Sequence, residues 1–270
     1  MFKFRRKDKM YWTMKKISSV ICLLCLTVIT SSAQISMRQF LSGIAVGQPV
    51  EKGVYASQDD MANLGCWMGA VNKNPVRGIK SPIAGSPLSW TGYGERDNSI
   101  VLGSSFSPGV HGQHPICYGF QRSMIGGNVY LSFITDFKSI KNRKYWTAVG
   151  FSNQVWGPQH WCCAVFYPAD NDGKSYNVGI RLMGGLMVVD RIFKTDEKHL
   201  IVLKYNIDSN ILSVFIDPDL SRPEPLPDEK VSAQIPDANN IISGLYIRDV
   251  SDNEGRMGSF RVARVWEDIR

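Results

Sequence analysis

The strongest pattern of hydrophobic and polar positions lies in residues 199–217 and predicts a β-hairpin. One face of its first half carries Ile201, Leu203, Tyr205 and Ile207, and the other face carries Leu200, Val202 and Lys204. A period of two places one set against a core and leaves the opposite set partly exposed. Asp208, Ser209 and Asn210 suit the joining turn because their short polar side chains bond to nearby backbone groups.

Similar short segments follow one another from Pro87 onward and predict an all-β protein. Besides the hairpin, the predicted strands are 99–103, 128–137, 145–151, 161–167, 176–182, 186–193, 241–248 and 257–266. No segment keeps a 3.6-residue apolar period, which disfavours parallel α/β folds. We therefore predict two antiparallel sheets packed face to face in a jelly-roll sandwich.

Two regions differ from this pattern. Residues 217–236 contain five prolines, which exclude a central strand and predict a long surface connection. Glycine interrupts every apolar run in residues 36–86, where we expect short strands and turns with a brief helix near 58–64.

The N-terminus has the order of a secretory signal peptide: a basic segment, an apolar segment and a small-residue site ending at Ala33. The apolar segment 17–30 is shorter than the about 20 residues that a membrane span needs. We therefore predict a signal peptide over 1–33, a single β-sandwich domain over 34–270 and no membrane span after cleavage. Met14, which precedes Lys15 and Lys16, is an alternative start to Met1.

Charge and cysteine content limit the function classes. The segment 1–33 holds seven of the 31 basic residues and one of the 24 acidic residues, so residues 34–270 carry 24 basic against 23 acidic side chains. The high overall charge of +7 is therefore no argument for nucleic-acid binding. The cysteines left after cleavage are Cys66, Cys117, Cys162 and Cys163, which allow three pairings or buried free thiols. Cys162 and Cys163 are neighbours in a predicted strand, so we expect them on opposite faces.

Several motifs occur in order along the chain: YGERDNSIVLG, GGNVYLSFITDF, YNVGIRL, HLIVLKYNIDSNILSVFIDPDLSRPEP, IISGLYIRD and GSFRVARVWEDI. Together they resemble the concanavalin A-like, LamG-like jelly-roll domains of exported proteins of Bacteroidetes type. The resemblance implies the same two-sheet fold and a periplasmic, cell-surface or extracellular location, and it allows calcium as a ligand. Within these motifs we expect Trp266 to fill the core or a sheet edge, and Lys204 to be solvated rather than paired with Glu224 or Asp217.

Signatures of catalysis and metal binding are incomplete. Glycosidases of this fold place carboxylates in a Glu-x-Asp-x-x-Glu pattern, and Glu95-Arg96-Asp97 lacks the second glutamate. Residues 170–173, DNDG, match only part of a calcium loop and predict a tight turn instead. His160 and Cys162 have no second pair of zinc ligands. We therefore expect no catalytic residues, no metal site and no cofactor.

Aromatic residues in two glycine-containing loops are the candidate ligand-binding groups. Trp156, Gln159 and His160 combine a flat apolar surface with hydrogen-bonding groups, as a sugar site requires. Trp90 and Tyr93 form a second such pair.

These features favour a secreted, non-catalytic β-jelly-roll protein with a glycan or cell-surface partner, and not a nucleic-acid partner. Two alternatives stay open: a structural or protein-interaction module of the cell envelope, and a carbohydrate-active hydrolase or lyase with a non-standard site.

Because the leader ends at Ala33, we predict that the mature protein begins at Gln34 and is recovered outside the cytosol. N-terminal sequencing of the secreted or periplasmic fraction checks this. Recovery from the cytosol with the leader intact contradicts it.

Overall fold

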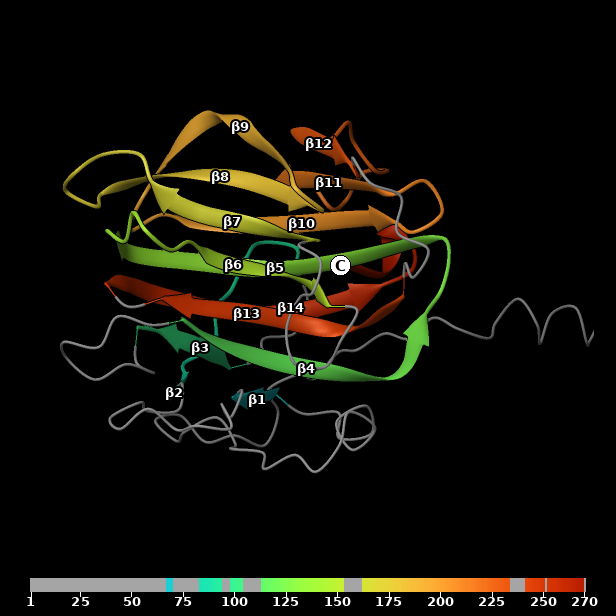
Figure 1. Cartoon of the computed structure of the whole chain (residues 1–270), viewed down its shortest axis with the longest axis horizontal. Helices are drawn as coiled ribbons and strands as arrows, with labels where there is room; N and C mark the ends of the chain where they lie inside the picture. The colour runs from blue at the N-terminus through green and yellow to red at the C-terminus, as the bar shows by residue number, and fades with distance from the viewer. Residues whose placement is uncertain are drawn as a thin grey trace, which may run out of the picture. The chain divides into compact units, whose positions relative to one another are not determined.

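The predicted all-β architecture is confirmed by the structure, a computed structural model that describes residues 67–69, 83–93, 98–103, 113–152, 162–233, 241–250 and 252–269. These residues form two seven-stranded sheets that pack face to face, and every strand pair is antiparallel (Figure 1). No helix among the described residues is long and apolar enough to cross a membrane.

Sheet I and sheet II are defined by the order of their strands. Sheet I contains β1 (Trp67–Gly69), β4 (Gln113–Met124), β13 (Ile242–Val250), β6 (Thr147–Ser152), β7 (Cys162–Pro168), β8 (Ser175–Leu182) and β9 (Gly185–Lys194). Sheet II contains β12 (Glu229–Ser232), β11 (Ile211–Ile216), β10 (Lys198–Asn206), β5 (Asn128–Ile140), β14 (Asn253–Ala263), β3 (Ser99–Leu102) and β2 (Ile83–Gly85). A short 3₁₀ helix, η1 (Trp266–Ile269), follows β14. Strand β5 lies between β10 and β14, and β13 lies between β4 and β6, so strands distant in sequence are neighbours, as in a jelly roll.

The predicted hairpin is strands β10 and β11. Leu203 pairs with Val214, and Lys204 pairs with Ser213. Asn210 closes the turn with a φ of +54°, in the left-handed region that asparagine tolerates better than most residues. Local alternation and turn chemistry therefore predicted this element correctly.

Two strands lie where the sequence did not predict them. Strand β4 contains Pro115 and Gly119 and has no clean alternation, yet it pairs with both β1 and β13. Strand β12 lies inside the proline-rich segment expected to be a connection, but it occupies the edge of sheet II, where proline neighbours are tolerated. The last predicted strand ends at Ala263, and Trp266 begins η1 instead. The helix expected near 58–64 lies outside the described residues.

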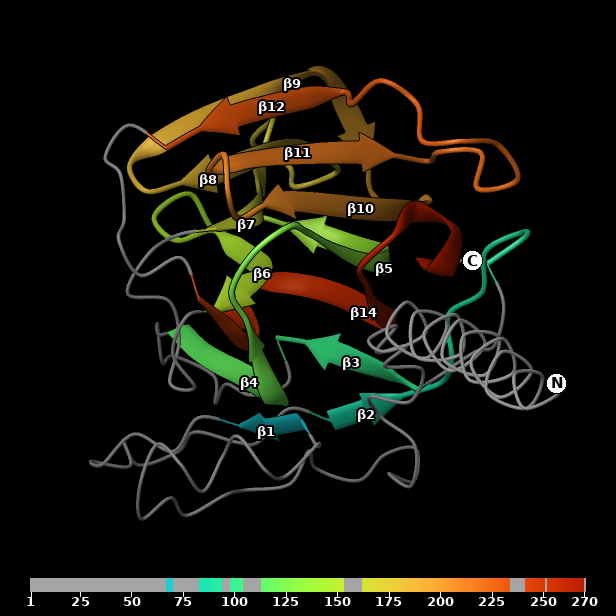
Figure 2. The ribbon, with the colours of Figure 1, turned by 90° about the vertical axis from the view of Figure 1, so that its right-hand side faces the viewer.

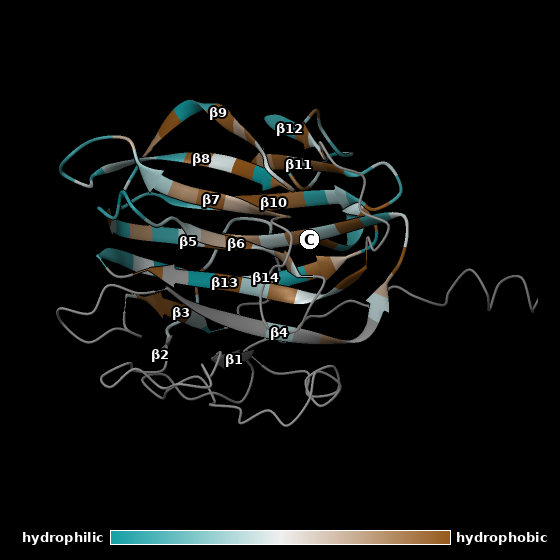
Figure 3. Ribbon diagram, in the orientation of Figure 1, coloured by the Kyte–Doolittle hydropathy of each residue, from teal (hydrophilic) through white to brown (hydrophobic). Residues whose placement is uncertain are grey.

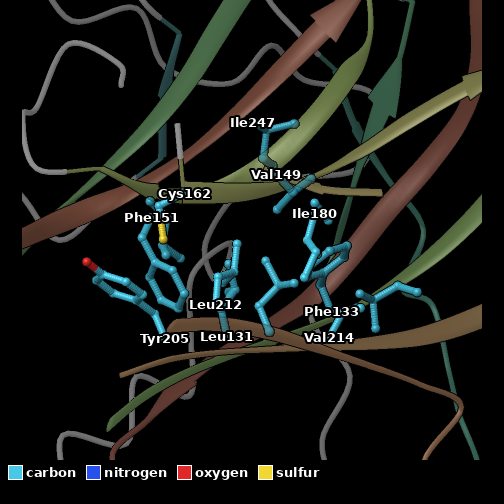
Figure 4. Packing of buried hydrophobic residues seen from close by; sticks show 14 of the residues in the cluster. Leu131, Phe133, Val149, Phe151, Cys162, Ile180, Tyr205, Leu212, Val214 and Ile247 are labelled. Atoms are coloured by element: carbon cyan, nitrogen blue, oxygen red, sulfur yellow. The ribbon is translucent and has the colours of Figure 1, made fainter. Parts of the chain in front are cut away.

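The main core fills the space between the sheets. Leu131 and Phe133 of sheet II point toward Val149, Phe151 and Ile180 of sheet I (Figure 4), and all five are fully or almost fully buried. The alternation of apolar and polar positions that produces this packing is visible along the strands (Figure 3).

A second apolar layer covers the outer face of sheet II. Leu200 and Val202 of β10 are fully buried in it, so the expectation of a partly exposed face was wrong. The layer contains Leu88, Tyr93, Tyr130, Ile134, Leu200, Val202, Phe215, Leu220, Ala263, Trp266 and Ile269. Figure 2 shows η1 over this sheet, and Trp266 donates from Nε1 to the carbonyl of Arg222 at 3.1 Å. The prediction that Trp266 fills the core or a sheet edge is confirmed, since Trp266 is buried in the second apolar layer.

Glu224 joins the proline-rich connection to sheet II. Its Oε1 accepts a hydrogen bond from Lys204 Nζ at 2.6 Å, and its Oε2 accepts one from the Tyr130 hydroxyl at 2.6 Å. Burial and the hydrogen bond to Glu224 raise the pKa of Tyr130. The expectation of a solvated Lys204 was therefore wrong, because the connection after β11 folds back over the outer face of sheet II, where Glu224 supplies a carboxylate.

A buried carboxylate gives the fold a measurable pH dependence. Asp136 of β5 is 3 % exposed and accepts a hydrogen bond from Arg256 at 2.6 Å, with Lys138 at 3.3 Å. Burial raises the pKa of Asp136, but Arg256 and Lys138 outweigh it and hold that pKa below the usual 3.8. A lowered carboxyl pKa adds stability above pH 3.8, and this stability is lost as the pH falls through the folded-state pKa.

We therefore expect Asp136→Asn to lower the free energy of unfolding by about 1.5–3 kcal/mol at neutral pH. The variant should also lose less stability than the wild type when the pH falls from neutral to about 2. Thermal melts across this range measure both effects. Asp190→Asn, at an exposed position of β9, is the matched control. Equal acid sensitivity of the wild type and Asp136→Asn contradicts the assignment.

Candidate functional site

The outer face of sheet I is the best candidate for ligand binding among the described surfaces. The outer face of sheet II is closed by the second apolar layer. Sheet I instead has a small buried cluster on its outer side, with Trp146 and Tyr167 half-buried beside it. Half-buried aromatic side chains on a sheet face can offer apolar contact area to a ligand.

Strand alternation selects the residues of this face. Cys162 belongs to the core between the sheets, whereas Cys163 belongs to the outer cluster with Ala148, Val165 and Tyr246. The two cysteines thus lie on opposite faces, as predicted. We call Ala148, Cys163, Val165 and Tyr246, together with Trp146 and Tyr167, the outer-face cluster.

Small residues bring the strands of this face close together. A Cβ atom on Gly150 would lie 2.2 Å from the carbonyl oxygen of Cys162 and 2.5 Å from Cβ of Cys163. Gly179 of β8 pairs with Val165 and Val188, and a Cβ there would lie 3.1–3.2 Å from its neighbours. Gly150 and Gly179 are thus positions where the neighbouring strands lie too close for a larger side chain.

The aromatic pair stands at one end of β6 and β7. The ring centroids of Trp146 and Tyr167 are 5.3 Å apart and the rings are inclined by 31°. Burial raises the pKa of Tyr167, so its hydroxyl stays protonated at neutral pH and can donate a hydrogen bond. The pair therefore offers ring surface with one polar group beside it.

Two arginines lie next to these aromatic side chains. The guanidinium carbon of Arg181 is 5.9 Å from the centre of the Trp146 ring, and that of Arg248 is 5.9 Å from the centre of the Tyr145 ring. Lys144 Nζ is 5.2 Å from the same tyrosine ring. Burial and the neighbouring Arg181 lower the pKa of Arg248. Because an arginine keeps its charge even so, this face combines aromatic rings with permanent positive charge.

Strand β9 borders the same face with apolar side chains. Leu186 pairs with Arg181, Val188 with Gly179 and Ile192 with Asn177. These three side chains are 38 %, 39 % and 65 % exposed. Since β9 is the edge strand of sheet I, its apolar residues extend the candidate surface to the sheet edge.

Comparisons with known proteins show no family and only distant structural similarities. No family model matches the sequence, and no curated protein matches it. A domain described as the carbohydrate recognition domain of Emp47p is 11 % identical, with a TM-score of 0.40, over 79 % of this chain and 100 % of that chain. A protein of unknown function from Shewanella oneidensis MR-1 is 9 % identical, with a TM-score of 0.41, over 85 % and 92 % of the two chains.

The botulinum neurotoxin serotype D binding domain is 12 % identical, with a TM-score of 0.40, over 70 % of this chain. The chain spans 45 % of the length of that protein. It also spans less than half of the length of two other botulinum neurotoxin chains that it resembles. Similarities at these values do not indicate a ligand for this chain. Its ligand has to be inferred from its own residues.

The sequence-predicted binding residues have different positions. Trp156, Gln159 and His160 lie outside the described residues, in the connection between β6 and β7. Trp90 is half-buried and packs against the second apolar layer on sheet II.

Tyr93 is 2 % exposed, so the structure argues against the sequence-based proposal that its ring receives a ligand. Its hydroxyl donates to the carbonyl of Ser259 at 2.7 Å and shares a hydrogen bond with Ser132 at 2.7 Å. Arg261 lies 4.0 Å from its ring centre. Tyr93 ties the segment before β3 to sheet II.

The DNDG segment forms the turn that the sequence predicted. Oδ1 of Asp170 accepts a hydrogen bond from the Gly173 N–H at 2.9 Å, and its Oδ2 accepts one from the Ser175 hydroxyl. These hydrogen bonds lower the pKa of Asp170 to about 2. Both carboxylate oxygens of Asp170 thus accept hydrogen bonds within the turn. No group of three His, Cys, Asp or Glu side chains suited to a metal occurs in the described part of the chain.

A partly buried histidine–aspartate pair lies at the open end of the β10–β11 hairpin. His199 Nδ1 is 2.8 Å from Oδ2 of Asp217, and Oδ1 of Asp217 accepts the Leu200 N–H at 2.9 Å. His199 is 8 % exposed, and its ring makes edge-on contacts with the rings of Tyr176 and Phe193. Nε2 of His199 is buried with no hydrogen-bond partner, so no serine or cysteine nucleophile is placed against it. The pair fastens the end of the hairpin.

The outer-face cluster has a pattern in the sequence, although the aromatic residues of the loops did not predict it. Strict alternation in β6, β7 and β8 puts Trp146, Tyr167 and Arg181 on one face, with small residues between them. Reading the outward positions of adjacent strands together would have identified this face, but only if the strand order were known.

The reactivity of the Cys163 thiol reports how tightly the outer-face cluster is packed. Burial raises its pKa to about 12, against a usual value of 9.0, although Tyr246 and the two arginines act in the opposite direction. At pH 8 the thiolate fraction would fall from roughly a tenth to on the order of one in ten thousand.

We therefore predict that native Cys163 reacts with iodoacetamide at least about a thousandfold more slowly than in the unfolded chain. Peptide mass spectrometry after timed labelling, with and without guanidinium, measures the rate for Cys163 directly. Rapid labelling of Cys163 in the folded protein would show that the cluster is open.

Proposed function

We propose that this chain is an exported, non-catalytic β-sandwich module that binds glycans on the outer face of sheet I. The observation that carries the proposal is the half-buried Trp146–Tyr167 pair on rigid strands. Sugar rings present apolar C–H faces and polar edges, and they stack on aromatic rings while nearby groups bond to their hydroxyls.

The geometry of the pair favours binding without rearrangement. Trp146 directly precedes β6 and Tyr167 lies within β7, and Thr147 pairs with Phe166 between them. Aromatic side chains fixed on a sheet lose little conformational entropy when a ligand binds. The two rings are inclined by 31° with centroids 5.3 Å apart, so they contact each other and hold each other in place beside the ligand.

Export and the absence of catalysis complete the proposal. Residues 1–33 have the composition of a secretory leader, and residues 34–270 are almost neutral. The His199–Asp217 pair fastens the end of the hairpin, and we assign no catalytic role to it.

A protein-interaction module is the second candidate function. The exposed Leu186, Val188 and Ile192 on edge strand β9 favour it, because apolar residues at a sheet edge suit a protein partner.

Trp146→Ala tests the glycan proposal, because it removes the larger ring of the pair. We expect loss of glycan-array binding and at least a tenfold weaker affinity for the best glycan by calorimetry, since burying an apolar side chain of this size contributes about 1.5–3 kcal/mol. Trp146→Phe should restore part of the affinity, because it keeps an aromatic face.

Trp90→Ala is the matched control, since it removes a half-buried tryptophan from the other sheet. It should alter the melting temperature but not the affinity. If Trp146→Ala binds glycans as well as the wild type, the proposed site is wrong. If Trp156→Ala alone abolishes binding, the loop between β6 and β7 is the site instead.

A further inference from the structure

We propose that the chain forms a two-fold symmetric dimer, in which the free edge of strand β9 pairs antiparallel with β9 of a second copy. The pairing segment is residues 190–194, DRIFK, with Ile192 on the two-fold axis. This inference goes beyond the proposed glycan binding and does not depend on it.

Strand β9 combines a free edge with exposed apolar side chains. It is the last strand of sheet I, and β8 is its only hydrogen-bonded neighbour among the strands that the structure describes. Eight large apolar side chains are exposed in the described part of the chain, and four of them belong to β9: Leu186, Met187, Val188 and Ile192. An edge strand presents unpaired N–H and C=O groups, and an apolar edge favours pairing with another chain. Of the described surfaces, this edge is therefore the best suited to a strand from outside.

The middle of β9 curves away from β8. Val188 pairs with Gly179 and Ile192 pairs with Asn177, which leaves residues 189–191 opposite a single residue of β8. Figure 1 shows the resulting arch of β9 on the side that faces away from β8. The backbone of this segment thus projects toward the free edge, where a second copy can reach it.

Alternation continues through the arch and assigns each side chain to a face. Val189 and Phe193 are buried in the core between the sheets. Asp190, Ile192 and Lys194 therefore share the outer side of sheet I, and all three are exposed. Ile192, the middle one, is 65 % exposed.

The charges on this side are complementary to those of an identical strand that runs in the opposite direction. When Ile192 lies opposite Ile192 of the second copy, Asp190 of each copy lies opposite Lys194 of the other. Opposite charges directly across an antiparallel pair are favourable, and like charges are unfavourable. The dimer thus has an apolar contact on its axis and one ion pair on each side of it, as a self-complementary two-fold interface requires.

Axes at the other residues of the segment place like charges together. An axis perpendicular to the sheet keeps outer side chains opposite outer side chains, so it passes through a residue and its own copy. At Asp190 it opposes two carboxylates, at Arg191 two guanidinium groups and at Lys194 two ammonium groups. At Phe193 it brings Asp190 opposite Asp196. The charge pattern therefore selects the register centred on Ile192.

This dimer joins the two copies of sheet I edge to edge. Because the axis is perpendicular to the sheet, the outer faces of both copies lie on the same side. For the proposed glycan-binding module, this gives two sites that can bind one polymer or one surface, and such bivalent binding is tighter than binding through either site alone.

Sedimentation equilibrium of the full mature chain, from low micromolar to near-millimolar concentration, measures the association. We expect a reversible monomer–dimer equilibrium with no larger species, because a two-fold interface closes on itself.

Charge exchange within the segment tests the register. Asp190→Lys and Lys194→Asp each place like charges opposite each other twice per dimer, so each should weaken association at least about tenfold. The double variant should associate as the wild type does. An equimolar mixture of the two single variants should form a heterodimer, because each copy then opposes the charges of the other.

Lys230→Asp makes the same chemical change on β12, the edge strand of sheet II, and should leave association unchanged. Melting temperatures of dilute, monomeric samples should agree among all variants, since the exchanged side chains are exposed in the single chain.

Several results would overturn the dimer. They are a monomer at every concentration, assembly beyond the dimer, equal association of the wild type and Asp190→Lys, no recovery in the double variant, or an equal loss in Lys230→Asp. None of them bears on glycan binding at Trp146, which is measured on the array and by calorimetry with monomeric chain.

Discussion

Burial of strand β5 on both faces is the constraint on which the rest of the structure depends. Leu131 and Phe133 enter the core between the sheets, while Tyr130 and Ile134 enter the second apolar layer outside sheet II. Each such side chain contributes about 1.5–3 kcal/mol when fully buried. A strand that is apolar on both faces specifies its register weakly, so polar positions have to decide it.

Those polar positions are Ser132 and Asp136. Ser132 shares a hydrogen bond with the Tyr93 hydroxyl, and Asp136 accepts one from Arg256 of the neighbouring β14. A shift of one residue would bury the Asp136 carboxylate in the core without its arginine, at a cost of several kcal/mol. The register of β5 in turn sets that of β10 and β14 and, through the core, the position of sheet I against sheet II.

This arrangement also determines where a ligand can bind. The segment before β3, the connection after β11 and η1 close the outer face of sheet II with Tyr93, Leu220 and Trp266. The outer face of sheet I has small residues at Ala148 and Gly150 instead. Trp146 and Tyr167 pack against the cluster that contains Ala148, and Arg181 lies beside the Trp146 ring. The outer faces of the two sheets thus differ in the side chains that pack on them.

The sequence by itself determined the elements whose information is local. Alternation located β5, β8 and the β10–β11 hairpin, and short polar residues located the turns at Asn210 and Gly173, because period and turn chemistry act over a few residues. Only the tertiary structure decided that Leu200 and Tyr93 are buried, that Lys204 is paired with Glu224, and that Trp146 and Arg181 share a face. The partners in these contacts are far apart in the chain, and strand order, which no local pattern encodes, brings them together.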